Sequence, residues 1–447
     1  MRTSAPNRAT LSQRVDSPAV HQGLPPPQFP EAARPRPQAL PVKPEKLADF
    51  GWRFRGRPVR VLEDHSFKLE STRERTAFLL PYCSDGDSLM SCLQCGMCTA
   101  RCNLAETGSL FPRRQMTFVQ LGQRESLLAD QSIWLCFNCT DCSAGCPAKA
   151  RPGRIMAAAR LWAIEHYSTP RFLARLANAP KAYPWLFFVA ALFLLAAIAI
   201  GGSFSPATTS VHYASMLPHL TLNILFSGVA GYALISALIG VGRAWKAFVG
   251  EPIWRADLRS LLLAAREAGR EILTHRGFSK CQQYPFSRWA HSAVLYGFLT
   301  LFALAGCAAL LILIGAPYPF PALHPLKIAG NLGAAAVVVG SLYFLWQRYR
   351  GSGNGDPSSW FDWALLWNLL LLSVTGILAE TFRYANLARA AYPTYFIHLL
   401  FAFVLLAGLS YSKLAHGIYR ALALAAREYG ALAESRRAYT DHRRVAA

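Results

Sequence analysis

Charged residues are scarce in this chain, and acidic ones are scarcer than basic ones. They make up 16% of 447 residues, with 25 Asp and Glu against 46 Lys and Arg, so the formal net charge is +21. Hydrophobic residues reach 53%. An apolar chain with this basic excess is typical of a membrane protein with positively charged cytoplasmic loops, and less typical of a nucleic-acid-binding protein. We therefore expect no nucleic-acid partner.

Motifs for substrate chemistry are also missing. The Gly-rich segments at 351–356 and 240–245 do not lie between a strand and a helix, as a dinucleotide fingerprint does. We find no motif for a flavin or a molybdenum cofactor. Residues 1–45, rich in Pro, Arg, Ala and Ser, lack the apolar core of a signal peptide and predict a disordered tail. The sequence therefore shows no substrate-converting site.

Cysteine is where the sequence is most specific. The runs "CLQCGMCTARC" and "CFNCTDCSAGCP" share the spacing C-x2-C-x2-C-x3-C, which binds [4Fe–4S] clusters, each fourth Cys ligating the other cluster. This rule assigns one cluster to Cys92, Cys95, Cys98 and Cys146, and the other to Cys102, Cys136, Cys139 and Cys142. Zinc sites and disulfide frameworks rarely use two identical four-Cys runs. Cys83 fits neither run and is expected to be a bystander.

The chain divides by composition after the second Cys run. We expect a cytoplasmic, mainly helical cluster domain at 46–168, a linker at 169–183, a membrane domain at 184–420 and a cytoplasmic tail at 421–447. The membrane domain holds six apolar stretches, each long enough to cross about 30 Å of hydrocarbon. They lie at about 184–202, 219–242, 289–314, 327–347, 361–382 and 394–415.

Lys and Arg in the connections predict the orientation. The loop at 203–218 has none, whereas the connection at 243–288 has nine. Basic loops stay in the cytoplasm, so both termini and the clusters are expected there, in the inner membrane of a bacterium. Arg383 and Arg389 oppose this orientation. Within the long connection, Asp257 can cap an amphipathic helix that either lies on the membrane surface, docks a partner or covers the bundle.

Histidines near the ends of the spans form a second candidate site. His398 and His416 are 18 residues apart on the predicted last span, which places them on one face about 27 Å apart. By depth, His291 pairs with His416 near the inner surface and His324 with His398 near the outer surface. Two such pairs are what two b haems need as axial ligands. His219 is a rival outer ligand or a quinone-site residue.

Several segments together resemble a known family. They include the two Cys runs, "RWAHSAVLYGF", "HPLKIAGNLGA", "TGILAETFR", "AYPTYFIHLLFAF" and "YSKLAHGIYR", and they cover about residues 90–420. They resemble fused iron–sulfur and cytochrome b subunits of heterodisulfide reductase, and more closely the membrane subunits of the quinone-interacting membrane-bound oxidoreductase complex. In that haem-bundle type, a His pair 18 apart on the last span is characteristic. The other two ligands usually lie ten apart on one span, but Leu301 occupies the position ten after His291, so His324 must replace that ligand.

The resemblance implies an electron-transfer role. Quinone exchanges electrons with cytoplasmic flavoprotein and iron–sulfur partners resembling the flavoprotein subunit of heterodisulfide reductase, which in turn serve adenylylsulfate reductase. Lys327 and Glu380 are candidate proton donors for an outer quinone site, or they pair with each other or snorkel. An outer quinone site would make turnover electrogenic. The alternatives are a redox subunit for a heterodisulfide, sulfite or tricarballylate partner, and a haem-free, membrane-anchored iron–sulfur protein.

Overall fold

The structure is a computed structural model that divides into two compact units, residues 1–69 and 70–447. It describes residues 53–54, 57–58, 75–83, 87–105, 110–206, 209–275, 277, 286–316, 319–350 and 359–446. The predicted disordered tail at 1–45 lies outside these residues. In the first unit, β1 (Arg53–Phe54) and β2 (Arg57–Pro58) pair antiparallel, with Arg53 opposite Pro58.

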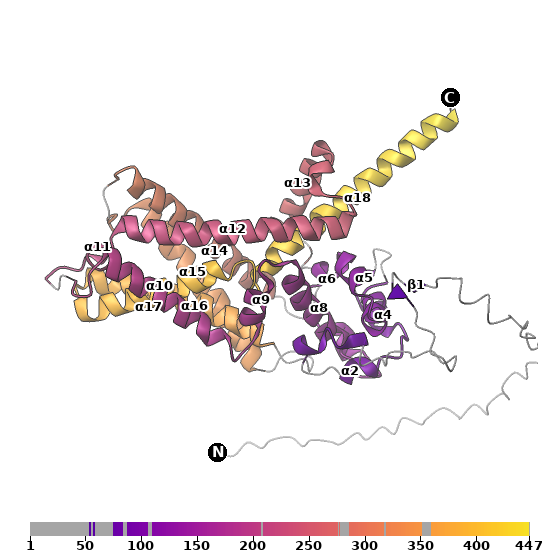
Figure 1. The fold of residues 1–447 in the computed structure, drawn as a ribbon, viewed down its shortest axis with the longest axis horizontal. Coiled ribbons are helices and arrows are strands. Elements are labelled where there is room, and N and C mark those ends of the chain that lie inside the picture. Colours follow the sequence, from indigo (N-terminus) through magenta and orange to yellow (C-terminus); the bar gives the residue numbers. More distant parts are fainter. Residues whose placement is uncertain are drawn as a thin grey trace, which may run out of the picture. The chain divides into compact units, whose positions relative to one another are not determined.

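The second unit is helical, as expected (Figure 1). Its first part contains short helices between and around the Cys runs. These are η2 (Leu80–Tyr82), α2 (Asp87–Met90), α3 (Met97–Ala100), α4 (Arg113–Gln120), α5 (Arg124–Ala129), α6 (Ser132–Leu135), α7 (Asp141–Ala144) and α8 (Pro152–Tyr167). Pro152 begins α8 at a position where its missing N–H is not needed by the helix.

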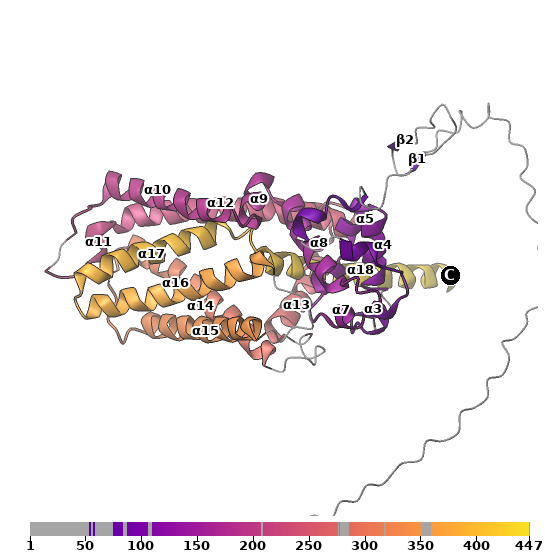
Figure 2. The ribbon, with the colours of Figure 1, turned by 90° about the horizontal axis from the view of Figure 1, so that it is seen from below.

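Six helices are long and apolar enough to cross a membrane, which matches the predicted number among the described residues. They are α10 (Tyr183–Gly201), α12 (His219–Val249), α14 (Ser287–Leu313), α15 (Pro325–Tyr349), α16 (Trp360–Tyr384) and α17 (Ala388–Ala407). They run side by side in one bundle, and the short helices gather at one of its ends (Figure 2). We call this the near end and the opposite one the far end.

Small residues bring α14 and α15 close together. A Cβ on Gly297 would lie 2.6 Å from the carbonyl oxygen of Gly333, and one on Gly340 would lie 2.7 Å from that of Ala290. Close backbone approach at small residues is how helices pack within a bilayer, where the apolar medium gives no hydrophobic drive.

The last predicted span is not one helix, so the expectation that His398 and His416 share a helical face is wrong. α17 ends at Ala407, and α18 (Ala415–Ala446) begins after a turn. Polar side chains fix this turn to distant parts of the fold, in addition to its own backbone hydrogen bonds. Ser410 donates to the carbonyl of Ala233 at 2.9 Å, and its own carbonyl accepts from Ser168 at 3.1 Å. These partners come from distant segments, so local sequence did not reveal the break.

The segment expected as a tail at 421–447 is instead part of α18. Leu422, Ala423, Leu424 and Ala426 are buried there. The expected linker at 169–183 contains α9 (Arg171–Asn178), and α12 continues seven residues beyond its predicted end at 242. Two short elements complete the described order, α11 (Tyr213–Met216) and η4 (Ile253–Arg255).

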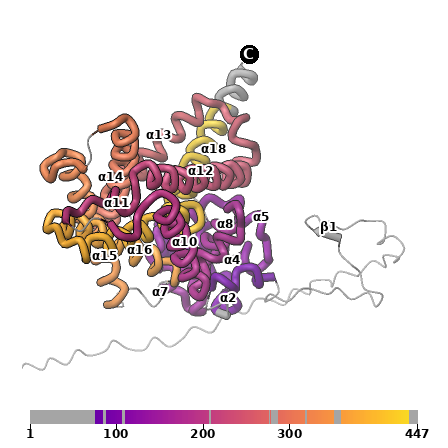
Figure 3. The backbone as a smooth tube through the Cα atoms, turned by 60° about the vertical axis from the view of Figure 1, so that its left-hand side comes forward, coloured from indigo at the N-terminus to yellow at the C-terminus, as the bar shows by residue number. Residues whose placement is uncertain are grey.

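The helix predicted after Asp257 is α13 (Leu258–Thr274), and it packs against α18 (Figure 3). Asp257 caps it by accepting the backbone N–H of Ser260 at 3.0 Å. The buried face consists of Ser260, Ala264 and Ala268, whereas Leu258 and Leu262 are exposed. The helix thus packs through its small residues and the partly buried Leu261, and it leaves Leu258 and Leu262 exposed.

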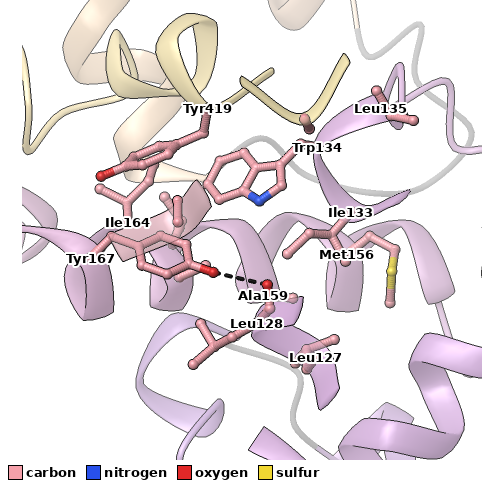
Figure 4. Packing of buried hydrophobic residues seen from close by; sticks show 14 of the residues in the cluster. Leu127, Leu128, Ile133, Trp134, Leu135, Met156, Ala159, Ile164, Tyr167 and Tyr419 are labelled. Carbon is pink, nitrogen blue, oxygen red and sulfur yellow. Dashed lines mark hydrogen bonds between the residues drawn. The ribbon is translucent and has the colours of Figure 1, made fainter. Parts of the chain in front are cut away.

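An aromatic core joins α18 to the cluster domain (Figure 4). Tyr419 lies 4.8 Å from Trp134 and 5.4 Å from Tyr167, measured between ring centroids. Tyr167 also donates to the carbonyl of Leu128 at 2.8 Å. Buried aromatic pairs contribute about 0.5–1.5 kcal/mol each beyond the area they bury. The near end of the bundle and the cluster domain therefore share one core.

Candidate iron–sulfur site and the histidines of the bundle

The two Cys runs fold alike. In the first run, Gln94 and Gly96 have positive φ angles of 54° and 85°; in the second, Asn138 and Thr140 have 57° and 64° at the equivalent positions. α3 follows the first pair and α7 the second. The left-handed residues reverse the backbone between cysteines that are separated by two intervening residues. The repeated spacing therefore produces a repeated loop conformation.

The structure brings the cysteines together across the two runs, in the sets that the spacing rule groups. Cys92, Cys95, Cys98 and Cys146 line one pocket, which we call the open set. Cys142 interacts electrostatically with Cys102, Cys136 and Cys139, which we call together the enclosed set. Among the described residues, no three His, Cys, Asp or Glu side chains could hold a single metal ion. Thiols grouped around a larger space fit an iron–sulfur cube, whose thiolates sit on its outside.

Burial raises the pKa of the Cys92 and Cys98 thiols, and raises that of Cys102 to about 11. Burial also raises the pKa of Cys142. These thiols are therefore protonated at neutral pH without metal, and cluster binding must displace their protons. Backbone N–H groups already point at sulfur: Asn138 donates to Cys136 Sγ at 3.4 Å, and Ala150 donates to Cys146 Sγ at 3.3 Å. Such bonds favour the negative thiolates of a bound cluster and tune its potential.

The two sets differ in exposure. Cys95 of the open set is exposed, while no member of the enclosed set is. Two exposed apolar side chains line the same pocket as Cys95, with Leu93 75% and Met97 45% accessible. The open set is thus the one within reach of another protein.

Two arginines hold the loop of the enclosed set. Arg420 of α18 donates to the carbonyls of Trp134 and Leu135 at 3.0 and 2.9 Å, and its guanidinium lies 4.5 Å from the ring centroid of Phe137. Arg160 of α8 donates to the carbonyl of Cys136 at 3.1 Å. Arg420 lies one helical turn after His416. Sequence reasoning missed Arg420, because only the fold brings α18 to the Cys loop.

Three histidines meet at the near end of the bundle. His275 Nε2 and His291 Nδ1 are 2.9 Å apart, and His291 also interacts electrostatically with His416. His416 Nδ1 contacts the carbonyl of Lys413. The structure therefore brings the predicted inner pair together and adds His275, which the sequence analysis missed. Its position just after the amphipathic helix was the only available signal.

His398 lies midway along α17, farther from the start of its helix than the predicted span beginning at 394 implied, because α17 begins at Ala388. The side chain is half-buried and contacts α16. Its Nδ1 is 3.0 Å from the carbonyl oxygen of Leu372. A Cβ on Gly376 would lie 2.9 Å from His398 Cε1, so only glycine admits the imidazole here.

His324 has a capping role at the start of α15. Its Nδ1 accepts the N–H of Leu326 at 3.3 Å, and its ring stacks on Phe320 with centroids 4.6 Å apart. No hydrogen bond or ring contact between these two described residues joins His324 to His398. The structure thus shows no direct contact within the predicted outer pair, whose assignment stays a prediction. His219, the rival candidate, is the first residue of α12.

Lys327 and Glu380 form an ion pair at the far end, with Nζ and Oε1 3.2 Å apart and both side chains mostly buried. The pair joins α15 to α16. This geometry corresponds to the alternative in which the two charges stabilise each other. An ion pair of this kind neutralises both groups within an apolar surrounding.

The fold and the eight cysteines define an iron–sulfur protein of the electron-transfer class with a multi-pass membrane domain. Residues 88–150 match the 4Fe-4S dicluster domain family. A protein of Archaeoglobus profundus, named as similar to the C-type subunit of heterodisulfide reductase, is 35% identical over 83 residues, 18% of this chain and 44% of that protein. The chain thus spans under half of the length of this relative.

Two other relatives extend into the membrane domain. Citrate utilization protein B of Escherichia coli is 29% identical over 316 residues, 65% of this chain and 79% of that protein. The E-type subunit of a dihydromethanophenazine:CoB–CoM heterodisulfide reductase from Methanosarcina barkeri is 29% identical over 227 residues, 46% of this chain and 82% of that protein. No solved structure matches the chain. The chain is therefore similar both to the iron–sulfur and to the membrane subunits of heterodisulfide reductases.

Proposed function

We propose that this chain is the membrane electron-transfer subunit of a quinone-linked oxidoreductase complex, and that it connects membrane quinone with a soluble redox partner through two [4Fe–4S] clusters and two b haems. The observation that carries this proposal is the contact of Arg420 with the loop of the enclosed set, one turn from His416. It links the helix of a candidate haem ligand to the candidate cluster ligands.

The cysteines of the open set would hold one cluster, and those of the enclosed set the other. When bound, the clusters and haems supply one-electron carriers. The chain's own contribution is to separate the two sets by accessibility, since only the open set has an exposed cysteine. The apolar side chains around Cys95 support docking of the soluble partner there.

His291 and His416 would hold the near haem, and His398 and His324 the other. His398 Nδ1 lies 3.0 Å from the Leu372 carbonyl oxygen, and His291 Nδ1 lies 2.9 Å from His275 Nε2. A hydrogen bond at one ring nitrogen fixes the tautomer and orientation of a metal-binding histidine. The capping role of His324 makes it the weakest of the four assignments, and His219 remains its rival.

The resemblance to the quinone-interacting membrane-bound oxidoreductase complex supports a more specific assignment of the partners and the membrane. The partners would be flavoprotein and iron–sulfur proteins resembling the flavoprotein subunit of heterodisulfide reductase, and through them adenylylsulfate reductase. The chain would lie in a bacterial inner membrane with both termini and the clusters in the cytoplasm. The similarity to a protein named for dihydromethanophenazine and a heterodisulfide supports a membrane-carrier-to-thiol redox system.

A second candidate has its own observation. The citrate utilization protein matches the greatest share of this chain among the relatives above, across the cluster and membrane domains. It favours a redox subunit that serves an organic-acid partner, such as an enzyme of tricarballylate oxidation. Identifying the soluble flavoprotein that reduces or oxidises the purified chain would distinguish the two candidate functions.

A reduced-minus-oxidised optical spectrum of the detergent-solubilised chain, with a haem-to-protein ratio, tests the proposal first. We expect about two b haems per chain, one lost in His416→Ala and the other in His398→Ala. His212→Ala, an exposed residue whose backbone makes its contacts, should retain both. A chain that carries iron and no haem would instead support the haem-free, membrane-anchored alternative.

A further inference from the structure

The bundle contains a pocket at its near end that the site above does not use. It lies where the end of α17 and the following turn face α9, α10 and α16. Its lining consists of Ala177, Tyr183, Leu186, Phe361, Ala364, Leu365, Asn368, Val404, Leu405, Gly408 and Ser412. We call it the Asn368 pocket. None of the candidate haem ligands and none of the cysteines line it.

One buried polar group in this pocket lacks a hydrogen bond. The Asn368 side chain is only 3% accessible, and its Oδ1 has no hydrogen-bond partner. Tyr183 interacts with Asn368 through its side chain, so the amide has a partner on that side only. An unpaired buried carbonyl oxygen is costly and usually marks a place where a bound group completes the bonding. A ligand that donates a hydrogen bond to Asn368 Oδ1 would satisfy it.

The remaining walls limit the chemistry of that ligand. Apart from Asn368, Tyr183 and Ser412, the lining is aliphatic or aromatic. Close in sequence to lining residues of the pocket, Trp185, Phe188 and Trp360 are exposed on α10 and α16, two of the helices that are long and apolar enough to cross a membrane. A flat, apolar ring with a hydroxyl donor, arriving from the membrane, fits these requirements. A quinol is such a molecule.

We propose that the Asn368 pocket binds the head group of a quinol, whose hydroxyl donates to Asn368 Oδ1. This inference rests on the proposed function and places its quinone site at the near end. The far-end pair Lys327 and Glu380 is then structural, since the two charges already neutralise each other. The pocket lies on the same side as the cluster domain. Quinol oxidation there would leave no net charge crossing the bilayer, in contrast to the electrogenic turnover expected from an outer site.

Binding of the quinol analogue 2-heptyl-4-hydroxyquinoline N-oxide to the full-length, detergent-solubilised chain tests this, measured by quenching of the analogue's fluorescence. Asn368→Leu replaces the amide by an apolar group with the same number of heavy atoms, and Ala364→Phe fills the pocket while keeping Asn368. We expect each to weaken binding roughly tenfold or more, the value of one hydrogen bond or of lost space. The matched control is Lys327→Gln with Glu380→Gln, which should bind as the wild type does. Retention of the iron–sulfur spectrum shows that each variant is folded.

The outcomes distinguish a failure of the pocket assignment from a failure of the proposed quinone function. If the analogue still binds both pocket variants and is lost in the Lys327 and Glu380 double variant, the pocket assignment is overturned and the quinone function stands. If the wild-type chain itself fails to bind the analogue, the quinone function and the pocket both fall. Loss in both pocket variants alone supports the proposal.

Discussion

The open and enclosed sets of cysteines have the same spacing but different surroundings. The open set lines a pocket at the surface, and Cys95 is accessible beside exposed apolar residues. The enclosed set lies beneath α8 and α18, where Arg160 and Arg420 bind its loop. One motif thus makes two sites, one with an exposed cysteine and one whose loop is bound by α8 and α18. The contacts of Arg160 and Arg420 are with the loop of the enclosed set.

Loss of a ligand from the enclosed set should have the largest effect. We expect Cys142→Ser to remove roughly half of the iron, because each set would hold one of two equal clusters. We also expect it to lower the melting temperature, since α18 holds the loop of this set through the hydrogen bonds of Arg420. Cys95→Ser should affect iron in the open set and leave the packing of α18 intact. Iron analysis and thermal melts followed by circular dichroism measure both effects.

The matched control is Cys83→Ala. Cys83 is buried in the same core but belongs to neither set. It should keep all of the iron. Equal iron loss in Cys142→Ser and Cys83→Ala would contradict the assignment of the enclosed set, and equal melting behaviour of Cys142→Ser and Cys95→Ser would remove the contrast between the sets.

The same contrast explains what sequence could and could not predict. The cluster loops depend on residues within a few positions of each other, so the spacing alone grouped their cysteines. The six spans followed from apolar length. The break at Ser410 and the burial of Leu422 depend on partners more than 150 positions away, Ala233 and the cluster-domain core. The sequence analysis did not predict the position of His398 in its helix or the contact of Arg420, because both depend on where the last two helices begin.

Arg420 provides the second test, because it connects the enclosed set to α18. Arg420→Ala should lower the free energy of unfolding by about 3 kcal/mol, since two charge-assisted bonds and a cation–π contact are lost. Arg420→Lys keeps the charge and should recover only part, since an ammonium lacks the planar fork. Denaturant melts measure the stability. Stopped-flow spectra of reduction measure whether the bundle and the clusters remain in electronic contact.

Arg427→Ala is the control on the same helix. Arg427 pairs with the neighbouring Glu428 at the surface, so its loss should change stability by less than about 0.5 kcal/mol. An Arg420→Ala variant no less stable than Arg427→Ala would show that the Arg420 contact does not hold the enclosed set to α18.

The smallest effect should come from Asp257, which caps α13, the helix that packs against α18. Hydrogen bonds from Ser260 and the nearby Arg436 lower the pKa of Asp257 from 3.8 to about 2. Because the folded-state pKa is the lower one, the carboxylate stabilises the fold above pH 3.8, and this contribution is lost as pH falls through about 2.

Asp257→Asn mimics the protonated state at neutral pH, where the clusters are not exposed to acid. We expect faster hydrogen exchange in the first turn of α13, with unchanged iron content. Arg259→Ala, an exposed neighbour, should leave that exchange unchanged. Slower or equal exchange in Asp257→Asn would show that the negative charge of Asp257 does not stabilise the first turn of α13.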